Sequence, residues 1–212
     1  MNLKDARILI TGGSAGIGKA TAKILIEAGA KVLITGRDEN KLQNVAKELG
    51  AFYVAADIAS PVDIDKTIDT IHNQLGGLDV LINNAGIGEF PTLEELTLEA
   101  FQKVYNVNVF GLALLTQKVA QIFKAQNSGN IINIASTAAT RGFERGTIYA
   151  SSKFALRGMT ECWQAELRRY NVRVILVNPS EVPTAFAQPD RKEREEVPHK
   201  LTSVEIAHAI KG

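Results

Sequence analysis

Tyr149 and Lys153 are residues whose types and spacing suggest proton transfer. They are four residues apart in a segment with helical apolar spacing, so their side chains rise from one helix face, a turn apart. A nearby ammonium group favours the phenolate and lowers a tyrosine pKa from its ordinary value of about 10. We therefore expect Tyr149 to exchange protons near neutral pH. Taken alone, the pair also fits a surface lysine beside a core tyrosine.

Ser136 and Asn108 are two further candidates for the same chemistry. Ser136 follows the apolar run 130–135, where its hydroxyl could donate to a substrate carbonyl oxygen as negative charge develops there. Its alternative role is to cap a turn. Asn108 lies on the apolar face of a long helical segment, where a buried amide needs hydrogen-bond partners. We expect it to distort that helix and to hold an ordered water.

A glycine-rich segment, residues 11–18, lies between the first apolar run and the first helical pattern. In such a strand-turn-helix, Gly12 permits backbone angles closed to other residues, Gly16 lets a pyrophosphate approach the main chain, and Gly18 lets helix and strand pack closely. The start of the helix offers unpaired N–H groups to phosphate oxygens. The alternative is an ordinary turn, but the position of the segment favours dinucleotide binding.

Strand-like apolar runs alternate with helical segments, which predicts an α/β fold with helices on both faces of a parallel sheet. We expect a single doubly wound, Rossmann-type domain over residues 1–212, with strand order 3-2-1-4-5-6 and a last helix at Ser203–Ile210. The predicted strands are Arg7–Thr11, Lys31–Thr35, Phe52–Ala56, Val80–Asn83, Asn130–Ala135 and Val172–Asn178.

The candidate residues fall where ligands bind in such a sheet, beyond the carboxyl ends of the strands. The glycine segment follows the first predicted strand, and Asp57 follows the third. Asn84, Ser136 and Pro179 follow the fourth, fifth and sixth. Five segments are thereby expected on one rim of the sheet.

These motifs together resemble the short-chain dehydrogenase/reductase family over about residues 3 to 210 of this chain. The resemblance rests on the glycine turn, the Asn83–Gly86 segment and the four candidate catalytic residues. It implies that Tyr149 is the general acid of carbonyl reduction and that Ser136 positions the carbonyl. It also implies that Lys153 lowers the tyrosine pKa and binds the nicotinamide ribose, and that Asn108 maintains a water-linked proton path.

The same resemblance implies a set of cofactor contacts. Asp57 and Ile58 match an adenine-contacting pair, and residues 84–86 match the floor of the cofactor site. The segment that begins at Pro179 matches the nicotinamide side. With Arg37 from the argument below, the predicted contacts are Gly12, Ser14, Ala15, Gly16, Ile17, Gly18, Arg37, Asp57, Ile58, Asn84, Ala85, Gly86, Tyr149, Lys153, Pro179, Val182 and Thr184.

Three departures from the family pattern affect the expected pocket. Ser180 stands where the family usually has glycine, so its Cβ could crowd the nicotinamide side. Many relatives continue into a seventh, edge strand, which the given sequence lacks. Residues 183–202 form a short substrate-side loop, so the pocket should be open. Phe90, Phe143 and Phe186 suggest an apolar contribution, although each could simply pack its loop.

The end of the second strand bears on cofactor choice. Relatives that use NAD commonly have an acidic residue there, whereas this chain has Gly36 followed by Arg37. An arginine at this place suits a 2′-phosphate, which favours NADP(H). NAD(H) is the alternative, with Asp38 as the ribose ligand, but Asp38 is also a good N-cap for the next helix.

Composition excludes several classes of function. A formal charge of +1 gives no reason to expect nucleic acid, and no run of about 18 apolar residues predicts a membrane span. Histidines 72, 199 and 208 are expected to be surface or packing residues, and no cluster has metal-ligand spacing. Cys162 is the only cysteine, so no intrachain disulfide can form, and we expect it to be buried or half-buried.

The sequence therefore predicts a cytoplasmic oxidoreductase that transfers hydride between NADP(H) and a carbonyl or secondary alcohol. One alternative is a non-catalytic regulatory or scaffold protein that binds a nicotinamide cofactor. Another is epimerisation or dehydration at the same site. The resemblance also implies a homodimer or homotetramer formed through the two long helices, to which Phe110, Trp163 and Tyr170 could contribute.

Overall fold

Parallel strands form one sheet in the computed structural model, which describes residues 2–186 and 192–212. The strands are β1 (Arg7–Thr11), β2 (Lys31–Gly36), β3 (Phe52–Ala55), β4 (Val80–Asn83), β5 (Gly129–Ile134) and β6 (Val172–Val177). Their order is β3-β2-β1-β4-β5-β6, as the sequence predicts. The chain winds outward from β1 to β3 and then returns to β4, so the winding reverses between β1 and β4.

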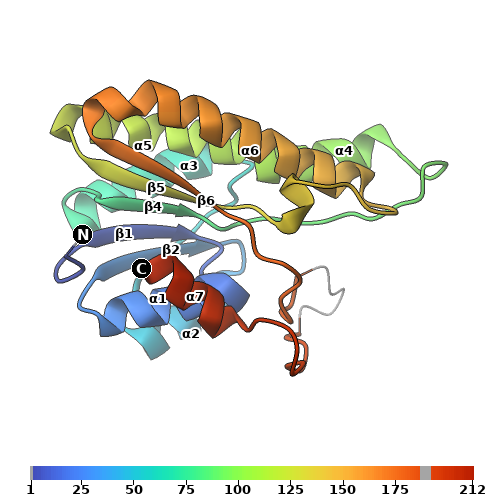
Figure 1. Ribbon diagram of the computed structural model, residues 1–212. Helices are drawn as coiled ribbons and strands as arrows, with labels where there is room; N and C mark the ends of the chain where they lie inside the picture. Colours follow the sequence, from blue (N-terminus) through green and yellow to red (C-terminus); the bar gives the residue numbers. More distant parts are fainter. Residues whose placement is uncertain (1, 187–191) are drawn as a thin grey trace.

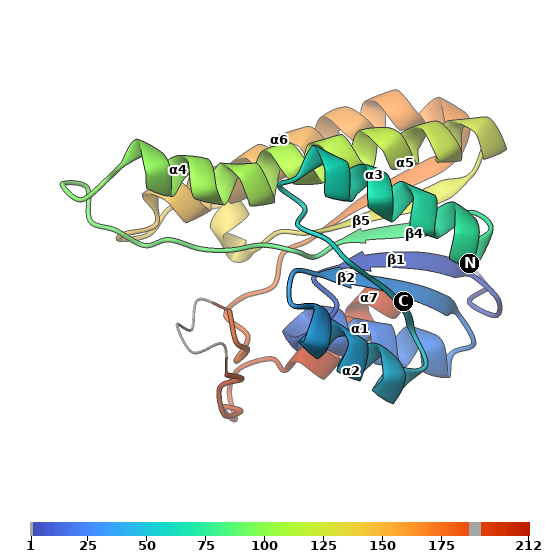
Figure 2. The same cartoon turned by 180° about the vertical axis from the view of Figure 1, so that it is seen from behind.

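Helices cover both faces of this sheet, which gives a three-layered Rossmann-type domain (Figures 1 and 2). The helices are α1 (Gly16–Glu27), α2 (Glu39–Leu49), α3 (Pro61–Thr70), α4 (Leu98–Tyr105), α5 (Leu112–Gln126), α6 (Thr147–Leu167) and α7 (Ser203–Lys211). One face carries α1, α2 and α7, with α7 packed against α1. The other face carries α3, α4, α5 and α6. None of the helices in the described ranges is long and apolar enough to cross a bilayer.

Alternation along the strands divides the core into an apolar cluster on each face of the sheet. Ile8 and Ile10 of β1 belong to the cluster that includes residues of α1 and α7. Leu9, between them, belongs to the cluster that includes Leu115 and Val119 of α5. Successive side chains of a strand point to opposite faces, so a strand covered on both faces must be apolar at every position.

The helix ends follow the local signals in the sequence. Asp38 caps α2 by accepting a hydrogen bond of 3.0 Å from the Lys41 backbone N–H, and Gly50 ends that helix with a φ of 72°. Ser60 caps α3 in the same way, with Pro61 at the first helical position. These caps fix where each helix begins after its strand.

Several expected boundaries differ from the observed ones by a residue. β3 ends at Ala55 rather than residue 56, and β5 covers Gly129–Ile134 rather than 130–135. β6 ends at Val177 rather than residue 178, whereas β2 and α7 each extend one residue further than expected. Hydrophobic residues in a sequence indicate burial rather than strand pairing. At the rim, some buried residues lie beyond the last residue that pairs with a neighbouring strand, so the predicted ends differ from the observed ones.

Cys162 is a clearer error of the sequence analysis. We expected it to be buried or half-buried, but its side chain is exposed. Thr160 and Leu167 lie on the buried face of α6, and Cys162 lies two residues beyond Thr160, on the outward side of the helix. The sequence analysis recognised the helix but not the orientation of this residue.

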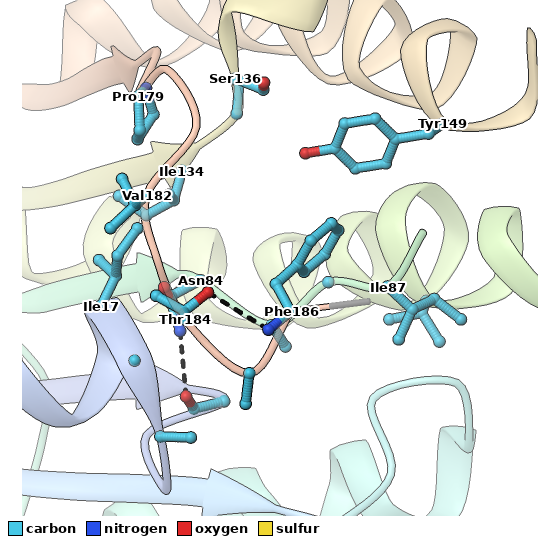
Figure 3. Close-up of a pocket in the computed structure, with 18 of the residues that line it drawn as sticks. Ile17, Asn84, Ile87, Ile134, Ser136, Tyr149, Pro179, Val182, Thr184 and Phe186 are labelled. Atoms are coloured by element: carbon cyan, nitrogen blue, oxygen red, sulfur yellow. Dashed lines mark hydrogen bonds between the residues drawn. The ribbon is translucent and has the colours of Figure 1, made fainter. Parts of the chain in front are cut away.

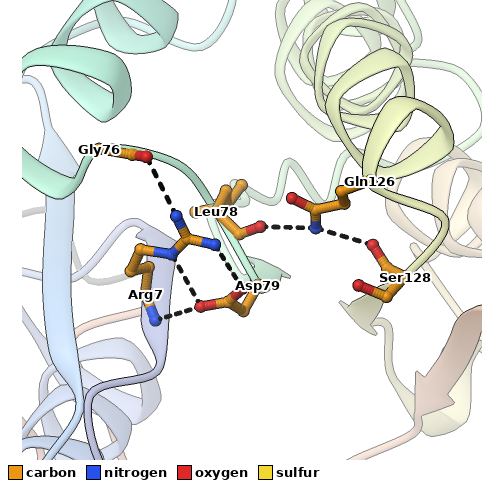
Figure 4. A network of polar contacts seen from close by, with 6 residues as sticks. All are labelled: Arg7, Gly76, Leu78, Asp79, Gln126 and Ser128. Atoms are coloured by element: carbon orange, nitrogen blue, oxygen red, sulfur yellow. Dashed lines mark hydrogen bonds and ion pairs between the residues drawn. The ribbon is translucent and has the colours of Figure 1, made fainter.

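A polar network ties β1 to β4 at the end of the sheet opposite the rim (Figure 4). The Arg7 guanidinium donates from Nε and Nη2 to the two oxygens of Asp79, at 2.9 and 2.7 Å, and the Arg7 backbone N–H donates to the same carboxylate at 2.8 Å. Nη1 of Arg7 donates to the Gly76 carbonyl. These hydrogen bonds lower the pKa of Asp79 below its ordinary value.

Candidate active site

A cavity of about 930 Å³ opens at the carboxyl ends of the strands. It collects residues from all five segments that the sequence places on this rim. The predicted residues that line it are Gly12, Ser14, Ala15, Gly16, Ile17, Arg37, Asp57, Ile58, Asn84, Ala85, Gly86, Ser136, Tyr149, Lys153, Pro179, Val182 and Thr184. Gly18 and Asn108 are the predicted site residues that do not line it.

The glycine turn is packed as the sequence analysis expects. Gly12 has a φ of 67°, and a Cβ there would lie 3.0 Å from the Ala85 Cα. A Cβ on Gly18 would lie 2.3 Å from the Gly12 carbonyl oxygen, so α1 can sit this close to the turn only with glycine. Gly18 therefore shapes the turn from behind rather than lining the cavity.

Asn84 and Thr11 hold the turn against the end of β4. The Asn84 side-chain Nδ2 donates to the carbonyl oxygens of Thr11 and Gly12, at 2.9 and 3.0 Å. The Thr11 hydroxyl accepts from the backbone N–H groups of Asn84 and Ala85, each at 3.0 Å. The Asn84 amide thus fixes the shape of the turn, a function that the sequence analysis did not assign to it.

A carboxylate from far along the chain lies against the first turn of α1. Glu193 accepts a hydrogen bond of 2.8 Å from the Gly16 backbone N–H through Oε1, and one of 3.0 Å from the Ala185 N–H through Oε2. Next to it, Arg194 donates to the carbonyl oxygens of Val182 and Thr184. An acidic group at a helix N-terminus is electrostatically favourable, so this turn suits an anion.

The β2 end of the cavity carries two cationic side chains. Arg37 is exposed and Lys41 half-buried, and both line the cavity beside Ser14. Asp38, between them in sequence, uses its carboxylate to cap α2. The cap confirms the second of the two expectations for Asp38; Asp38 also lines the cavity, so the first, a contact with the cofactor ribose, stays a prediction.

Tyr149 and Ser136 face the cavity from two different elements. Tyr149 lies in the first turn of α6, and its ring extends into the cavity with the hydroxyl toward Ser136 and Ile134 (Figure 3). The Ser136 hydroxyl accepts a hydrogen bond of 3.1 Å from the Ala138 N–H, so the expected cap is present. Ser136 also lines the cavity with Tyr149, and its donation to a substrate carbonyl stays a prediction.

Burial raises the pKa of Tyr149 above its ordinary value, and the influence of the Ser136 hydroxyl, which lowers it, offsets only part of that rise. The sequence analysis expected a lowered pKa, and that expectation is wrong for this structure. It considered the charge of Lys153 but not the removal of the phenol from water, which disfavours the phenolate. In this environment Tyr149 keeps its proton at neutral pH.

Lys153 is a buried lysine and not the surface residue that the alternative interpretation required. It is 5% exposed, and its Nζ donates a hydrogen bond of 3.0 Å to the Ile134 carbonyl oxygen. The same Nζ lies 5.7 Å from the centroid of the Tyr149 ring. Burial lowers the pKa of Lys153 to about 8, because the charged form loses its hydration.

Asn108 lies at the point where the long helical segment is distorted. It is 1% exposed and belongs to a π-helical turn, Asn106–Gly111, that separates α4 from α5. Its side chain accepts from the Ile87 N–H and donates to the Ile87 carbonyl, both at 2.9 Å. It also donates to Ser152 Oγ at 3.0 Å, and Ser152 donates to the Tyr149 carbonyl. The expected distortion is confirmed, and Asn108 joins the Ile87 loop to the helix of Tyr149.

Residues 6–195 of the chain match a protein-family model described as short chain dehydrogenase. The chain belongs to the short-chain dehydrogenase family. This is a family of oxidoreductases that bind a nicotinamide cofactor and act on small molecules.

Members of the short-chain dehydrogenase family resemble this chain over almost its whole length. An uncharacterised oxidoreductase of Staphylococcus aureus (strain USA300) is 33% identical over 98% of this chain and 90% of its own. A 3-ketoacyl-(acyl-carrier-protein) reductase from Brucella melitensis, solved with NADH, has a TM-score of 0.90 at 32% identity, over 99% of this chain and 90% of its own. An alcohol dehydrogenase from the archaeon Thermococcus sibiricus, solved with 5-hydroxy-NADP, has a TM-score of 0.88 at 28% identity, over 97% and 88%.

The sequence analysis of this short-chain dehydrogenase missed several residues of the cavity wall. Lys41 could have been found from its place one turn into α2, near Arg37. Ile87 directly follows the Asn83–Gly86 segment and could also have been included. Glu193 does not line the cavity but contacts the first turn of α1, and it carried no such signal, because it lies in a run of alternating charges that is typical of a solvated loop. Among the described residues, no three His, Cys, Asp or Glu side chains gather as metal ligands would.

Proposed function

We propose that this protein is an NADP(H)-dependent oxidoreductase that interconverts a carbonyl compound and a secondary alcohol. One observation carries the proposal: Ser136, Tyr149 and Lys153 line the same cavity as a glycine turn built to accept an anion. Membership in a family of nicotinamide-dependent oxidoreductases supports it.

The residues present fit a dinucleotide. The backbone N–H of Gly16 donates a hydrogen bond to the Glu193 carboxylate, whose oxygen occupies the place that a phosphate oxygen would take. Asp57 and Ile58 line the cavity after β3, and Pro179, Val182 and Thr184 line it from the segment after β6. A nicotinamide cofactor bound along this rim would supply or accept the hydride.

The chain's own groups handle the proton. In carbonyl reduction, hydride adds to the carbonyl carbon while Tyr149 donates its phenolic proton to the carbonyl oxygen, which yields the alcohol. Because its pKa is raised, Tyr149 is protonated at neutral pH, which is the form that carbonyl reduction requires. Ser136 donates a hydrogen bond to the same oxygen as charge develops on it.

Lys153 and Asn108 support the tyrosine in different ways. With a pKa of about 8, Lys153 is mostly charged at neutral pH, and its positive charge stabilises the phenolate that proton donation leaves behind. Asn108 acts as a positioning residue, because its amide joins the Ile87 loop to Ser152 and so to the first turn of α6.

The preference for NADP(H) rests on Arg37 and Lys41. Both line the β2 end of the cavity, where a 2′-phosphate would meet two cations. The solved relatives hold both kinds of cofactor, NADH in the bacterial reductase and 5-hydroxy-NADP in the archaeal enzyme, so the argument comes from this chain's own residues.

The helices α5 and α6 provide the surface for the homodimer or homotetramer that we also propose. Exposed apolar side chains there are Phe110, Leu114 and Phe154. Trp163 and Tyr170, named from the sequence, are half-buried against the core and offer less surface. Sedimentation of the protein would measure the state, and a monomer at all concentrations would contradict this proposal.

The proposed activity is tested by following NADPH absorbance with a panel of ketones and aldehydes. We expect a steady loss of absorbance that depends on both protein and carbonyl compound. Binding of NADPH without turnover across the panel would instead favour the non-catalytic regulatory protein. A cytoplasmic location remains a prediction.

A further inference from the structure

Four aromatic rings meet at the catalytic end of the cavity. Tyr149 contacts Phe90 and Phe186, with centroid distances of 5.5 Å to each and interplanar angles of 54° and 55°. Phe143 contacts Phe90 at 6.2 Å. The rings come from the loop after β4, the loop before α6 and the segment after β6, and Figure 3 shows Phe186 near Tyr149. Segments far apart in the sequence thus supply one aromatic wall.

Two glycines make room for these rings. A Cβ on Gly88 would lie 2.7 Å from the Phe90 ring and 3.1 Å from that of Phe186. A Cβ on Gly146 would lie 2.8 Å from the Phe143 ring. The rings therefore occupy space that any other residue at these positions would fill.

The loops that carry the rings are also fastened to each other. Arg145, next in sequence to Gly146, donates a hydrogen bond of 2.8 Å from Nε to the Phe90 carbonyl oxygen. This bond holds the Phe90 loop against the loop of Phe143. Two of the three segments that supply phenylalanine rings are thus joined by a hydrogen bond as well as by ring contacts.

The wall leaves aromatic surface open to a ligand. Phe143 is 48% exposed and Phe186 is 36% exposed, although both line the cavity. Covering large apolar side chains is favourable, so a ligand that lies against them gains burial energy. Because Tyr149 belongs to the same wall, that ligand would place its neighbouring atoms within reach of the phenol.

Resting on the proposed function, we infer that the preferred carbonyl substrate carries a flat aromatic group close to its reacting carbon. An aromatic group offers more to this wall than an alkyl group of equal size. Aromatic rings prefer tilted or offset contacts with one another, and such contacts add to the energy of burial alone. The observed ring pairs are all tilted, between 42° and 55°, which leaves faces and edges for a further ring.

A matched pair of ketones separates ring recognition from simple hydrophobicity. Phenylacetone and cyclohexylacetone both keep a methylene between the ring and the carbonyl, so their carbonyl groups have similar intrinsic reactivity. The saturated ring has the larger apolar surface, so burial alone predicts equal or better use of cyclohexylacetone. We expect kcat/KM with NADPH to be about threefold to tenfold higher for phenylacetone. A ratio of one or less would overturn the inference.

Leucine variants test which residues set that ratio. Phe186→Leu and Phe143→Leu keep an apolar side chain but remove the ring, and both positions are partly exposed, so folding should survive. Each variant should bring the phenyl-to-cyclohexyl ratio toward one. Phe52→Leu is the matched control, because Phe52 is a 39% exposed phenylalanine on β3 outside the cavity lining. An unchanged ratio in both cavity variants would contradict the inference.

Diacetyl, a small ketone without a ring, distinguishes failure of this inference from failure of the proposed function. Reduction of diacetyl together with equal use of the two ring ketones overturns only the aromatic preference. If no carbonyl compound is reduced, diacetyl included, the proposed function and this inference both fail. A lost phenyl preference in the cavity variants, with diacetyl still reduced, supports both.

Discussion

The carboxylate of Glu193 lies 2.8 Å from the backbone nitrogen of Gly16, at the first turn of α1. Under the proposed function, the pyrophosphate of a dinucleotide needs the same N–H group. The two anions cannot share it, so Glu193 must leave when the cofactor binds. The affinity for the cofactor then includes the cost of breaking the Gly16 and Ala185 hydrogen bonds.

Glu193→Gln should therefore bind NADPH more tightly. The amide keeps the shape of the side chain but loses the charge that competes with phosphate at the helix N-terminus. We expect the dissociation constant to fall about twofold to fivefold, in line with the usual energy of a charge at a helix end. NADPH fluorescence titration measures it, with Glu195→Gln as the control, an exposed neighbour outside the cavity lining. Equal affinities in all three proteins would show that Glu193 does not compete.

Arg37→Ala should weaken the use of NADPH far more than that of NADH. Only NADPH carries the 2′-phosphate, and a charge-assisted hydrogen bond to it is lost in the variant. We expect KM for NADPH to rise about tenfold, with KM for NADH changed less than twofold. Arg173→Ala, at an exposed position on β6 outside the cavity, serves as the control. Equal effects on both cofactors would remove the basis for NADP(H) preference.

Tyr149→Phe should abolish turnover while NADPH affinity stays near that of the wild type. The substitution removes the phenolic proton but keeps the ring that contacts Phe90 and Phe186. General acid catalysis contributes about a hundredfold to ten-thousandfold to the reaction rate, so kcat should fall at least about a hundredfold. Steady-state kinetics and a binding titration measure the two effects separately. Retained kcat would refute the role of Tyr149.

Lys153→Met should stabilise the protein at neutral pH while reducing its activity. Burial lowers the pKa of Lys153 to about 8 in the folded chain, whereas in the unfolded chain it is about 10.5. Between pH 8 and pH 10.5 the lysine is therefore protonated in the unfolded chain but mostly neutral in the folded one. The buried charge therefore costs stability most fully below pH 8, and the cost fades as pH rises toward 10.5. Urea unfolding at pH 7 and pH 9.5 should show a variant advantage of about 1 kcal/mol or more at pH 7 that shrinks at pH 9.5. An advantage that grows with pH would contradict the assignment.

Asp79→Asn should destabilise the fold without touching the cavity. It removes the charge that accepts three hydrogen bonds from Arg7, and we expect a loss of about 1–3 kcal/mol in the free energy of unfolding at pH 7. The pKa of Asp79 is lowered in the folded chain, so the ionised carboxylate contributes fully to stability at pH values above its pKa in the unfolded chain, about 3.9. That contribution is lost as the pH falls through the lower pKa of the folded chain. The gap between wild type and variant should close in acid. Asp69→Asn, at an exposed carboxylate on α3, should cost little at any pH.

The order of strands and helices, the glycine turn and the rim that carries the cavity could all be predicted from the amino-acid sequence. These follow from local rules: apolar periodicity marks each element, Asp38 and Ser60 mark helix starts, and parallel strands bring Asn84 and Ser136 to the same edge. Such signals act over a few residues, so they can be read without knowing the fold.

Features that depend on residues far apart in the chain could not be predicted in this way. The Glu193 contact joins residues 177 apart, and the rings of Phe90 and Phe186 reach Tyr149 from separate loops, with Phe143 packed against Phe90. The pKa of Tyr149 is raised where the sequence suggested a fall, because burial, which the whole fold produces, outweighs the lowering influence of Ser136. Periodicity in sequence shows which residues share a face, whereas solvent exclusion and long-range contacts exist only after the chain has packed.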